Sequence, residues 1–128
     1  MVEGCRIREL PDGGREFVLD DPTLSSIRID HQSTLSFGRT EVMIGGPFVL
    51  ERDGVVHHLS PRRWAALGPL VALYPSSVRW LWTSADGELT LVFHHGAVLA
   101  VPPDPADPAW SVGNVFARSS EAGPQPPG

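Results

Sequence analysis

Histidines and a neighbouring carboxylate are the residues of this chain that could do acid–base or metal chemistry. The five histidines are His31, the pair His57–His58 and the pair His94–His95. Asp30 directly precedes His31, and a carboxylate can orient an imidazole that acts as a base. Adjacent residues on a strand point to opposite faces, so neither pair is expected to bind one metal ion. For the same reason we expect the side chains of Asp30 and His31 to diverge.

The rest of the sequence adds no catalytic or metal-binding signature. It contains no HExxH spacing, no serine in a GxSxG turn and no glycine-rich phosphate loop. Cys5, the one cysteine, lies in a segment that we expect to be flexible. We therefore predict no catalytic residue, no metal site and no cofactor. One alternative stays open: a small-ligand or metal-dependent enzyme that uses Asp30, His31 and a turn histidine.

Polar side chains predict a binding surface instead. Arg28 and Asp30 are expected to form an ion pair on an exposed sheet face, and Gln32 follows them. Asp104 belongs to an acidic loop of the kind that can steer a basic partner towards a protein. The candidate binding residues are Asp30, Gln32, Arg79 and Asp104.

Tryptophans are the second candidate for a binding surface, since four occur in this short chain. Trp80 and Trp82 alternate in phase with Val78, and we expect all three in the core. In the opposite register the two indoles would form an aromatic patch of the kind that dominates protein interfaces. Arg62–Arg63 could bind a phosphate or a carboxylate, but two solvated arginines are the preferred interpretation.

These side chains must be positioned mainly by β-strands. Arg15–Leu19 is expected to be a short edge strand, and Ser60–Pro61 predicts the start of a helix over residues 61–74. Pro69 follows Gly68 inside that helical pattern and should divide or kink it. Alternating apolar residues predict further strands at 25–30, 34–37, 42–44, 48–51, 55–59, 78–83, 88–93 and 97–101, with Trp110–Ala117 a candidate for the last.

Two parts of the chain are similar in sequence. Ser25–Arg28 matches Ser76–Arg79, and Leu35–Phe37 matches Leu91–Phe93. Each part is predicted to be a three-stranded meander, which cannot bury its apolar face alone. We interpret the similarity as a duplication whose two copies pack on each other.

The predicted fold class is α+β and mainly antiparallel β. Two similar meanders, at about 25–51 and 76–112, would form a sandwich or a partly open barrel, with one kinked helix at 61–74 between them. Residues 1–118 are predicted to be a single globular domain, which agrees with a 128-residue chain that is 41% hydrophobic and 20% charged. Residues 119–128 are polar and proline-rich and are predicted to be a disordered tail.

Charge and hydropathy narrow the class of partner. The chain has 15 acidic and 10 basic residues, a net charge of -5, which disfavours nucleic acid and anionic membranes as partners. No apolar stretch is long enough to span a membrane. The N-terminal residues lack the apolar core of a signal peptide, so a cytoplasmic location is expected.

A set of short motifs is spread over about residues 25–112. Its residues are Ile29–Gln32, Leu35, Phe37, Pro47–Phe48, Leu67–Pro69, Gly87, Leu89, Leu91, Phe93, Gly96, Pro102–Asp104 and Trp110. This set resembles the bacterial family known as domain of unknown function 6188. The family has no assigned activity, so the resemblance implies no catalytic residue.

We therefore predict a non-catalytic protein-binding module, with an immunity or antitoxin-like protein that blocks its partner as the more specific form. The partner would be a basic toxin domain or a second copy of the chain. The sheet surface and loops would block it, and acidic loops would steer it.

Overall fold

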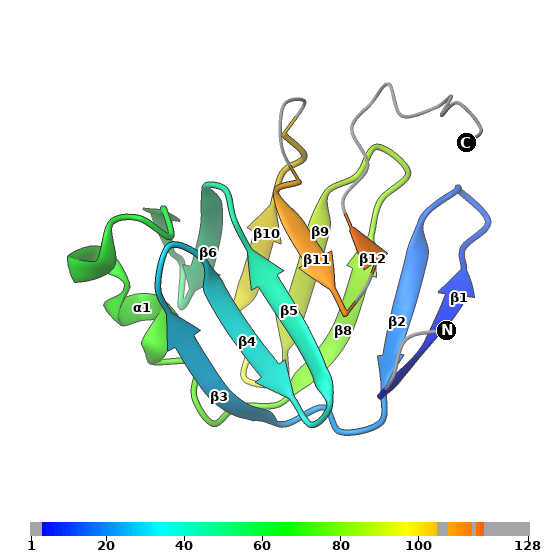
Figure 1. Cartoon of the computed structure of the whole chain (residues 1–128), viewed down its shortest axis with the longest axis horizontal. Helices are drawn as coiled ribbons and strands as arrows, with labels where there is room; N and C mark the ends of the chain where they lie inside the picture. Colours follow the sequence, from blue (N-terminus) through cyan, green and yellow to red (C-terminus); the bar gives the residue numbers. More distant parts are fainter. Residues whose placement is uncertain (1–3, 105–107, 114, 117–128) are drawn as a thin grey trace.

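The computed structural model describes residues 4–104, 108–113 and 115–116, so the predicted tail at 119–128 lies outside the described residues. Two antiparallel sheets face each other across an apolar core (Figure 1). The strands are β1 Cys5–Glu9, β2 Arg15–Leu19, β3 Leu24–Ile29, β4 Ser33–Phe37, β5 Thr40–Ile44, β6 Phe48–Arg52, β7 Val55–Leu59, β8 Val78–Thr83, β9 Leu89–Phe93, β10 Val98–Val101, β11 Trp110–Val112 and β12 Val115–Phe116.

The seven-stranded sheet has the order β1-β2-β8-β9-β10-β6-β7, and the five-stranded sheet has the order β12-β11-β5-β4-β3. In Figure 1 the five-stranded sheet is the front layer and the seven-stranded sheet is the back layer. The α+β, β-rich sandwich predicted from the sequence is confirmed. The candidate last strand is a short hairpin, because Gly113 turns the chain between β11 and β12.

The two sheets are built in the same way. Each contains a meander, β3-β4-β5 in one and β8-β9-β10 in the other. After β5 the chain crosses to the seven-stranded sheet, where β6 pairs with β10. After β10 it crosses back, and β11 pairs with β5. Each meander is therefore extended by the strand that follows the other meander, which is the arrangement that two duplicated halves would produce.

The core consists of the side chains that the two meanders turn towards each other. Leu35 and Phe37 on β4 and Leu91 and Phe93 on β9 are at most 1% exposed, as their alternation predicts. Val42 and Ile44 on β5 are completely buried. On β10 the buried residues are Leu99 and Val101. Alternation therefore identifies the buried face of most central strands.

A β-bulge in β8 reverses the predicted orientation of the tryptophans. Val78 pairs with Phe93, but Trp80 pairs with Val92, so Arg79 is an extra residue in the strand. After the bulge Leu81 points into the core and is 1% exposed, whereas Trp80 is 48% exposed. The prediction that Val78, Trp80 and Trp82 share a buried face is therefore wrong. One inserted residue shifts the two-residue alternation, so the side chains that follow it point to the opposite faces of the sheet.

The first hairpin also differs from the prediction. Cys5 was expected in a flexible segment, but it lies in β1, pairs with Leu19 and is 3% exposed. Burial, as the main cause, raises the pKa of the Cys5 thiol. Because β1 covers one side of β2 and β8 the other, β2 is not an edge strand. Two arginines alternate with the inward residues of β1, which makes its apolar pattern too short to recognise.

The helical segment is shorter than the 61–74 predicted. It consists of a 3-10 turn η1, Trp64–Ala66, and the four-residue helix α1, Gly68–Val71. Pro69 lies in the first turn of α1, where its missing N–H costs no helical hydrogen bond. Leu67, Leu70 and Leu73 are buried, so the segment closes one side of the sandwich (Figure 1). No described helix is long and apolar enough to cross a membrane.

Candidate functional site

The turn between β3 and β4 positions two of the predicted binding residues. The Asp30 carboxylate accepts a hydrogen bond from the Gln32 backbone N–H at 2.9 Å, which stabilises the turn. The Asp30 backbone carbonyl accepts a hydrogen bond from the Trp64 indole at 2.8 Å, which joins the turn to η1. His31 Nδ1 lies 3.6 Å from Asp30 Oδ1. The expectation that Asp30 and His31 diverge is wrong, because both lie in a turn and not in a strand.

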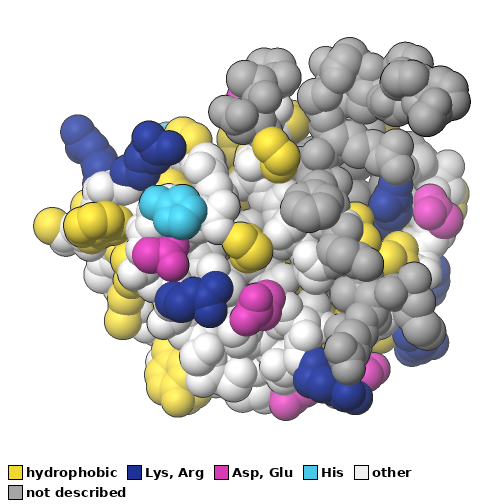
Figure 2. All heavy atoms as spheres, in the orientation of Figure 1, with side chains coloured by type: hydrophobic (Ala, Val, Ile, Leu, Met, Phe, Trp, Pro, Cys, Tyr) yellow, Lys and Arg dark blue, Asp and Glu magenta, His cyan; other side chains and the backbone are white. Residues whose placement is uncertain are grey.

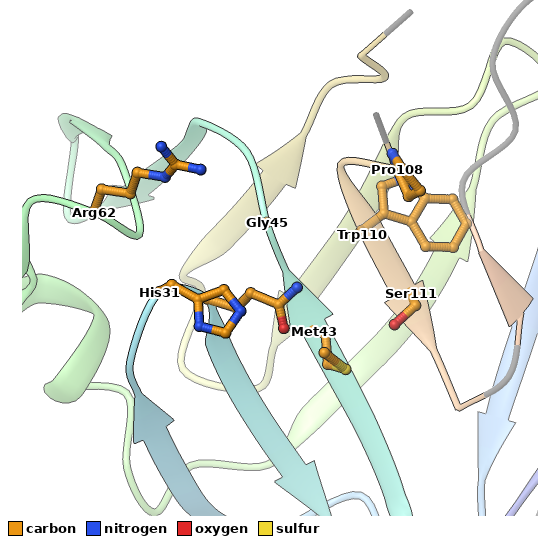
Figure 3. Close-up of a pocket in the computed structure, with 8 residues that line it drawn as sticks. His31, Met43, Gly45, Arg62, Pro108, Trp110 and Ser111 are labelled. Carbon is orange, nitrogen blue, oxygen red and sulfur yellow. The ribbon is translucent and has the colours of Figure 1, made fainter. Parts of the chain in front are cut away.

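This turn borders a polar hollow at one end of the five-stranded sheet. Its volume is about 380 Å³. In Figure 3, His31 lies in the middle of the view, Arg62 approaches from a separate loop, and Trp110 and Ser111 on β11 lie on the opposite side. The lining residues are His31, Gln32, Met43, Gly45, Arg62, Pro108, Trp110 and Ser111.

The side chains that line the polar hollow can form hydrogen bonds with a ligand that stays in contact with water. Arg62 can donate hydrogen bonds to a carboxylate or a phosphate, and the Gln32 amide and the Ser111 hydroxyl can add to them. The His31 side chain is 79% exposed and the Asp30 side chain 48%, so water and salt screen their charges. The geometry favours weak polar contacts over an activated acid or base.

The remaining histidines lie on other elements. His57 and His58 are on β7, and His94 and His95 form the turn between β9 and β10, all in the seven-stranded sheet. His95 stacks on Phe93 at 5.8 Å, and burial together with the nearby Arg52 lowers the pKa of His95. Within the described ranges, no group of three or more histidine, cysteine, aspartate and glutamate side chains could bind a metal ion.

The four predicted binding residues are distributed over both sheets. Asp30 and Gln32 share the β3–β4 turn, and the predicted ion pair is confirmed, with Arg28 Nε 3.7 Å from Asp30 Oδ2. Arg79 lies at the bulge in the other sheet, where its guanidinium is 4.6 Å from the centre of the Trp80 ring. Asp104 follows β10.

A second candidate region is the outer face of the seven-stranded sheet, which we call the apolar face. Since Leu81, Leu91 and Leu99 point into the core, their strand neighbours point outwards. Two rows of outward side chains cross the sheet in register. They are Trp80, Val92, Val98, Glu51 and Val56 in one row, and Trp82, Thr90, Ala100, Val49 and His58 in the other.

The apolar face is open at the positions where it is most hydrophobic. Trp80 is 48% exposed and Val56 is 50% exposed. A hollow of about 460 Å³ separates α1 from Val55 and His57, whose side chains alternate with Val56. Helix α1 therefore lies towards the inner side of β7. Within the part of the chain that the structure describes, no helix lies over the apolar face.

The outer face of the five-stranded sheet has a different character. Ser26 pairs with Ser36, and Ser36 with Glu41, all pointing outwards. The next row contains Arg28, Thr34, Met43 and Ser111. Charged side chains of both signs lie over this part of the surface in Figure 2. This is the usual exterior of a sheet that is buried on one side only.

The sequence prediction missed most residues of the apolar face. Trp80 and Trp82 had been considered for an exposed aromatic patch, but the core was preferred. The neighbouring residues could have indicated the correct orientation. If Trp80 and Trp82 were buried, Leu81 and Thr83 would point outwards, and leucine is more often fully buried than tryptophan. The outward positions of Val92 and Val98 depend on the register between strands, which no local pattern specifies.

The fold and its surfaces define an antiparallel β-sandwich with one polar and one apolar outer sheet face. The chain belongs to a family of unknown function, DUF6188, whose model matches residues 16–116. The resemblance noted from the sequence is thereby confirmed. None of the curated proteins and none of the solved structures compared with the chain matches it.

Proposed function

We propose that this protein is a non-catalytic protein-binding module that binds its partner through the apolar face. The observation that carries the proposal is the row Trp80, Val92, Val98, Glu51 and Val56, which points away from the core and is apolar at every position except Glu51. Contiguous apolar patches of several hundred Å² on a soluble protein usually mark an interaction surface. Tryptophans in such patches often provide a large part of the binding free energy.

The size of the apolar face supports this proposal. With about 4.8 Å between strands and 3.3 Å per residue, the seven strands span about 30 Å by 17 Å, or about 500 Å² in projection, and the five strands that present the two rows make up about two-thirds of this area. An aromatic side chain contributes about 25 cal/mol per Å² of apolar surface removed from water. Burial of the exposed half of Trp80, about 100 Å², would therefore contribute about 2.5 kcal/mol.

An immunity or antitoxin-like protein that blocks a basic partner is the more specific form of this proposal. The excess of acidic residues, 15 against 10 basic, supports it through electrostatic steering. The enzyme alternative has less support, because His31 and the turn histidines His94 and His95 belong to different sheets.

Photo-crosslinking from two positions tests the proposal. A benzophenone amino acid replaces either Trp80 on the apolar face or Tyr74, which is 53% exposed beside α1 and serves as the matched control. The variants are expressed in cells of the source organism and irradiated. We expect position 80 to form a discrete adduct with a protein and position 74 to form none. Equal crosslinking from both positions, or none from position 80, would contradict the proposal.

A further inference from the structure

We infer that the partner on the apolar face is a second copy of this chain, bound in a two-fold symmetric dimer. This inference rests on the proposed protein-binding function and, of the two partners expected from the sequence, assigns the second copy of the chain to the apolar face in place of a basic toxin domain. Two features of the face support it, its relief and its charge, because each half of the face is complementary to the other half. A partner of unrelated sequence does not require such a match within one face.

The relief of the apolar face is self-complementary about β9, the middle strand of the seven. On one side of β9, strand β8 presents Trp80 and Trp82. On the other side, β10 presents Val98 and Ala100. A two-fold axis running along β9 places β8 of one copy over β10 of its partner. Large indoles then face small side chains in both halves of the interface, which is how packed layers interdigitate.

The charges at the two ends of the apolar face are opposite. At the β1 end, Arg6 is exposed and stands in register with Val18, while Arg8 pairs with Glu16. At the other end Glu51 is exposed on β6. The same axis places β1 over β7 and β2 over β6 of the second copy. Arg6 on β1 of each copy therefore lies over β7 of the other copy, one strand away from Glu51 on β6, and the attraction occurs twice.

The area agrees with a reversible dimer. Two faces of about 500 Å² in projection bury about 1,000 Å² before side-chain relief is counted. This value is at the lower limit for a specific protein interface. We therefore expect a dissociation constant in the micromolar range.

Sedimentation equilibrium of the full chain measures this dimer directly. We expect a mass that rises from 13.9 kDa towards twice that value as the concentration increases to about 100 µM. Trp80→Ser should raise the dissociation constant at least about tenfold, and Tyr74→Ser, at a similarly exposed position, should leave it unchanged. Ala100→Arg provides a second disruption that fills the small half of the face. Circular dichroism verifies that each variant folds.

Charge reversal then tests the two-fold geometry. Arg6→Glu and Glu51→Arg should each weaken the dimer about threefold to tenfold, and the double variant should recover most of the loss. The inference is overturned if the unmodified chain stays monomeric at about 100 µM, or if Trp80→Ser leaves the dissociation constant unchanged. If the chain is monomeric while position 80 crosslinks to a different protein, the proposed function stands and the dimer is refuted. If neither occurs, both fail.

Discussion

The two sheets have equivalent meanders but opposite outer surfaces. When Leu35 on β4 is matched with Leu91 on β9, both point into the core and both are completely buried. The outward residues beside them differ at every matched position but one. In the first row, the seven-stranded sheet has Trp80, Val92 and Val98 where the five-stranded sheet has Ser26, Ser36 and Glu41. In the second row it has Trp82, Ala100 and Val49 where the five-stranded sheet has Arg28, Met43 and Ser111. The shared residue is threonine, at positions 34 and 90.

This difference separates what the fold requires from what it does not. The inner faces are alike because both sheets bury them against each other, and the hydrophobic effect acts equally on each. The outer face of an antiparallel sheet can be polar without any loss of folding, as the five-stranded sheet demonstrates. The apolar residues on the other sheet are therefore unnecessary for the fold. We infer that they are present for contact with another molecule.

The largest expected effect concerns the equivalent inner positions. Leu35→Ala and Leu91→Ala should each lower the free energy of unfolding by about 2–5 kcal/mol, since each removes a completely buried side chain and leaves a cavity. Urea unfolding at equal protein concentration measures both. A loss below about 1 kcal/mol at either position would show that the inner faces are not equivalent.

Exchange of the equivalent outer positions should have an unequal result. Val92→Ser should raise the dissociation constant of the dimer about tenfold, which corresponds to about 1.4 kcal/mol. Ser36→Val, the reverse change on the polar sheet, should leave it within about twofold. Sedimentation equilibrium measures both constants. Equal effects of the two exchanges would remove the proposed distinction between the outer faces.

The hairpins that extend the two sheets offer a smaller, symmetric test. Gly54 between β6 and β7 and Gly113 between β11 and β12 have positive φ angles of 80° and 59°. Alanine at either position should cost about 1 kcal/mol of stability, because a Cβ disfavours this backbone conformation. Gly68→Ala is the control, since its added Cβ, like that at Gly54, would contact nothing within 4 Å and its φ is not positive. Thermal unfolding should separate the two hairpin variants from the control.

The smallest effect is a pH dependence specific to the seven-stranded sheet. Burial and Arg52 lower the pKa of His95 in the β9–β10 turn, whereas the corresponding β4–β5 turn contains Gly38 and Arg39 and no histidine. As the pH falls below about 6.5, the unfolded chain binds a proton at His95 more readily than the folded chain does. Stability is therefore lost between the ordinary histidine pKa and the lowered folded value.

The melting temperature at pH 7.5 and pH 5.5, compared between the natural chain and His95→Gln, measures this contribution. The variant should lose less stability on acidification. An identical pH dependence in both proteins would show that His95 makes no contribution.

Much of the fold could be predicted from the sequence because it is encoded locally. Alternation identified the buried faces of β4 and β5, and between the predicted strands 48–51 and 55–59 the chain turns at Asp53 and Gly54, whose φ angles are 55° and 80°. The similarity between Leu35–Phe37 and Leu91–Phe93 indicated two comparable meanders. The match of Ser25–Arg28 with Ser76–Arg79 is wrong, because the strand pairing makes Ser26 equivalent to Trp80. β1 was missed because Arg6 and Arg8 interrupt its short apolar pattern, and its pairing with β2 depends on a hairpin closed by Leu10 and Gly14.

The candidate sites were less predictable than the fold. The polar hollow combines the β3–β4 turn, Arg62 and β11, which are far apart in the sequence. The contact between Asp30 and His31 arises because the chain turns there instead of continuing as a strand. The apolar face depends on the bulge at Arg79, which reverses the orientation of every later residue in β8. A bulge has no local sequence pattern as clear as that of a turn.

By itself, the sequence determined that this chain forms a mainly antiparallel β-sandwich and which side chains of most central strands are buried. Alternation and turn residues act over a few neighbours, and these interactions can be read along the chain. Only the tertiary structure decided which sheet presents tryptophans to the outside and which presents serines and charges. That outcome depends on register, on one inserted residue and on the exchange of strands between sheets, which are set by contacts between distant segments.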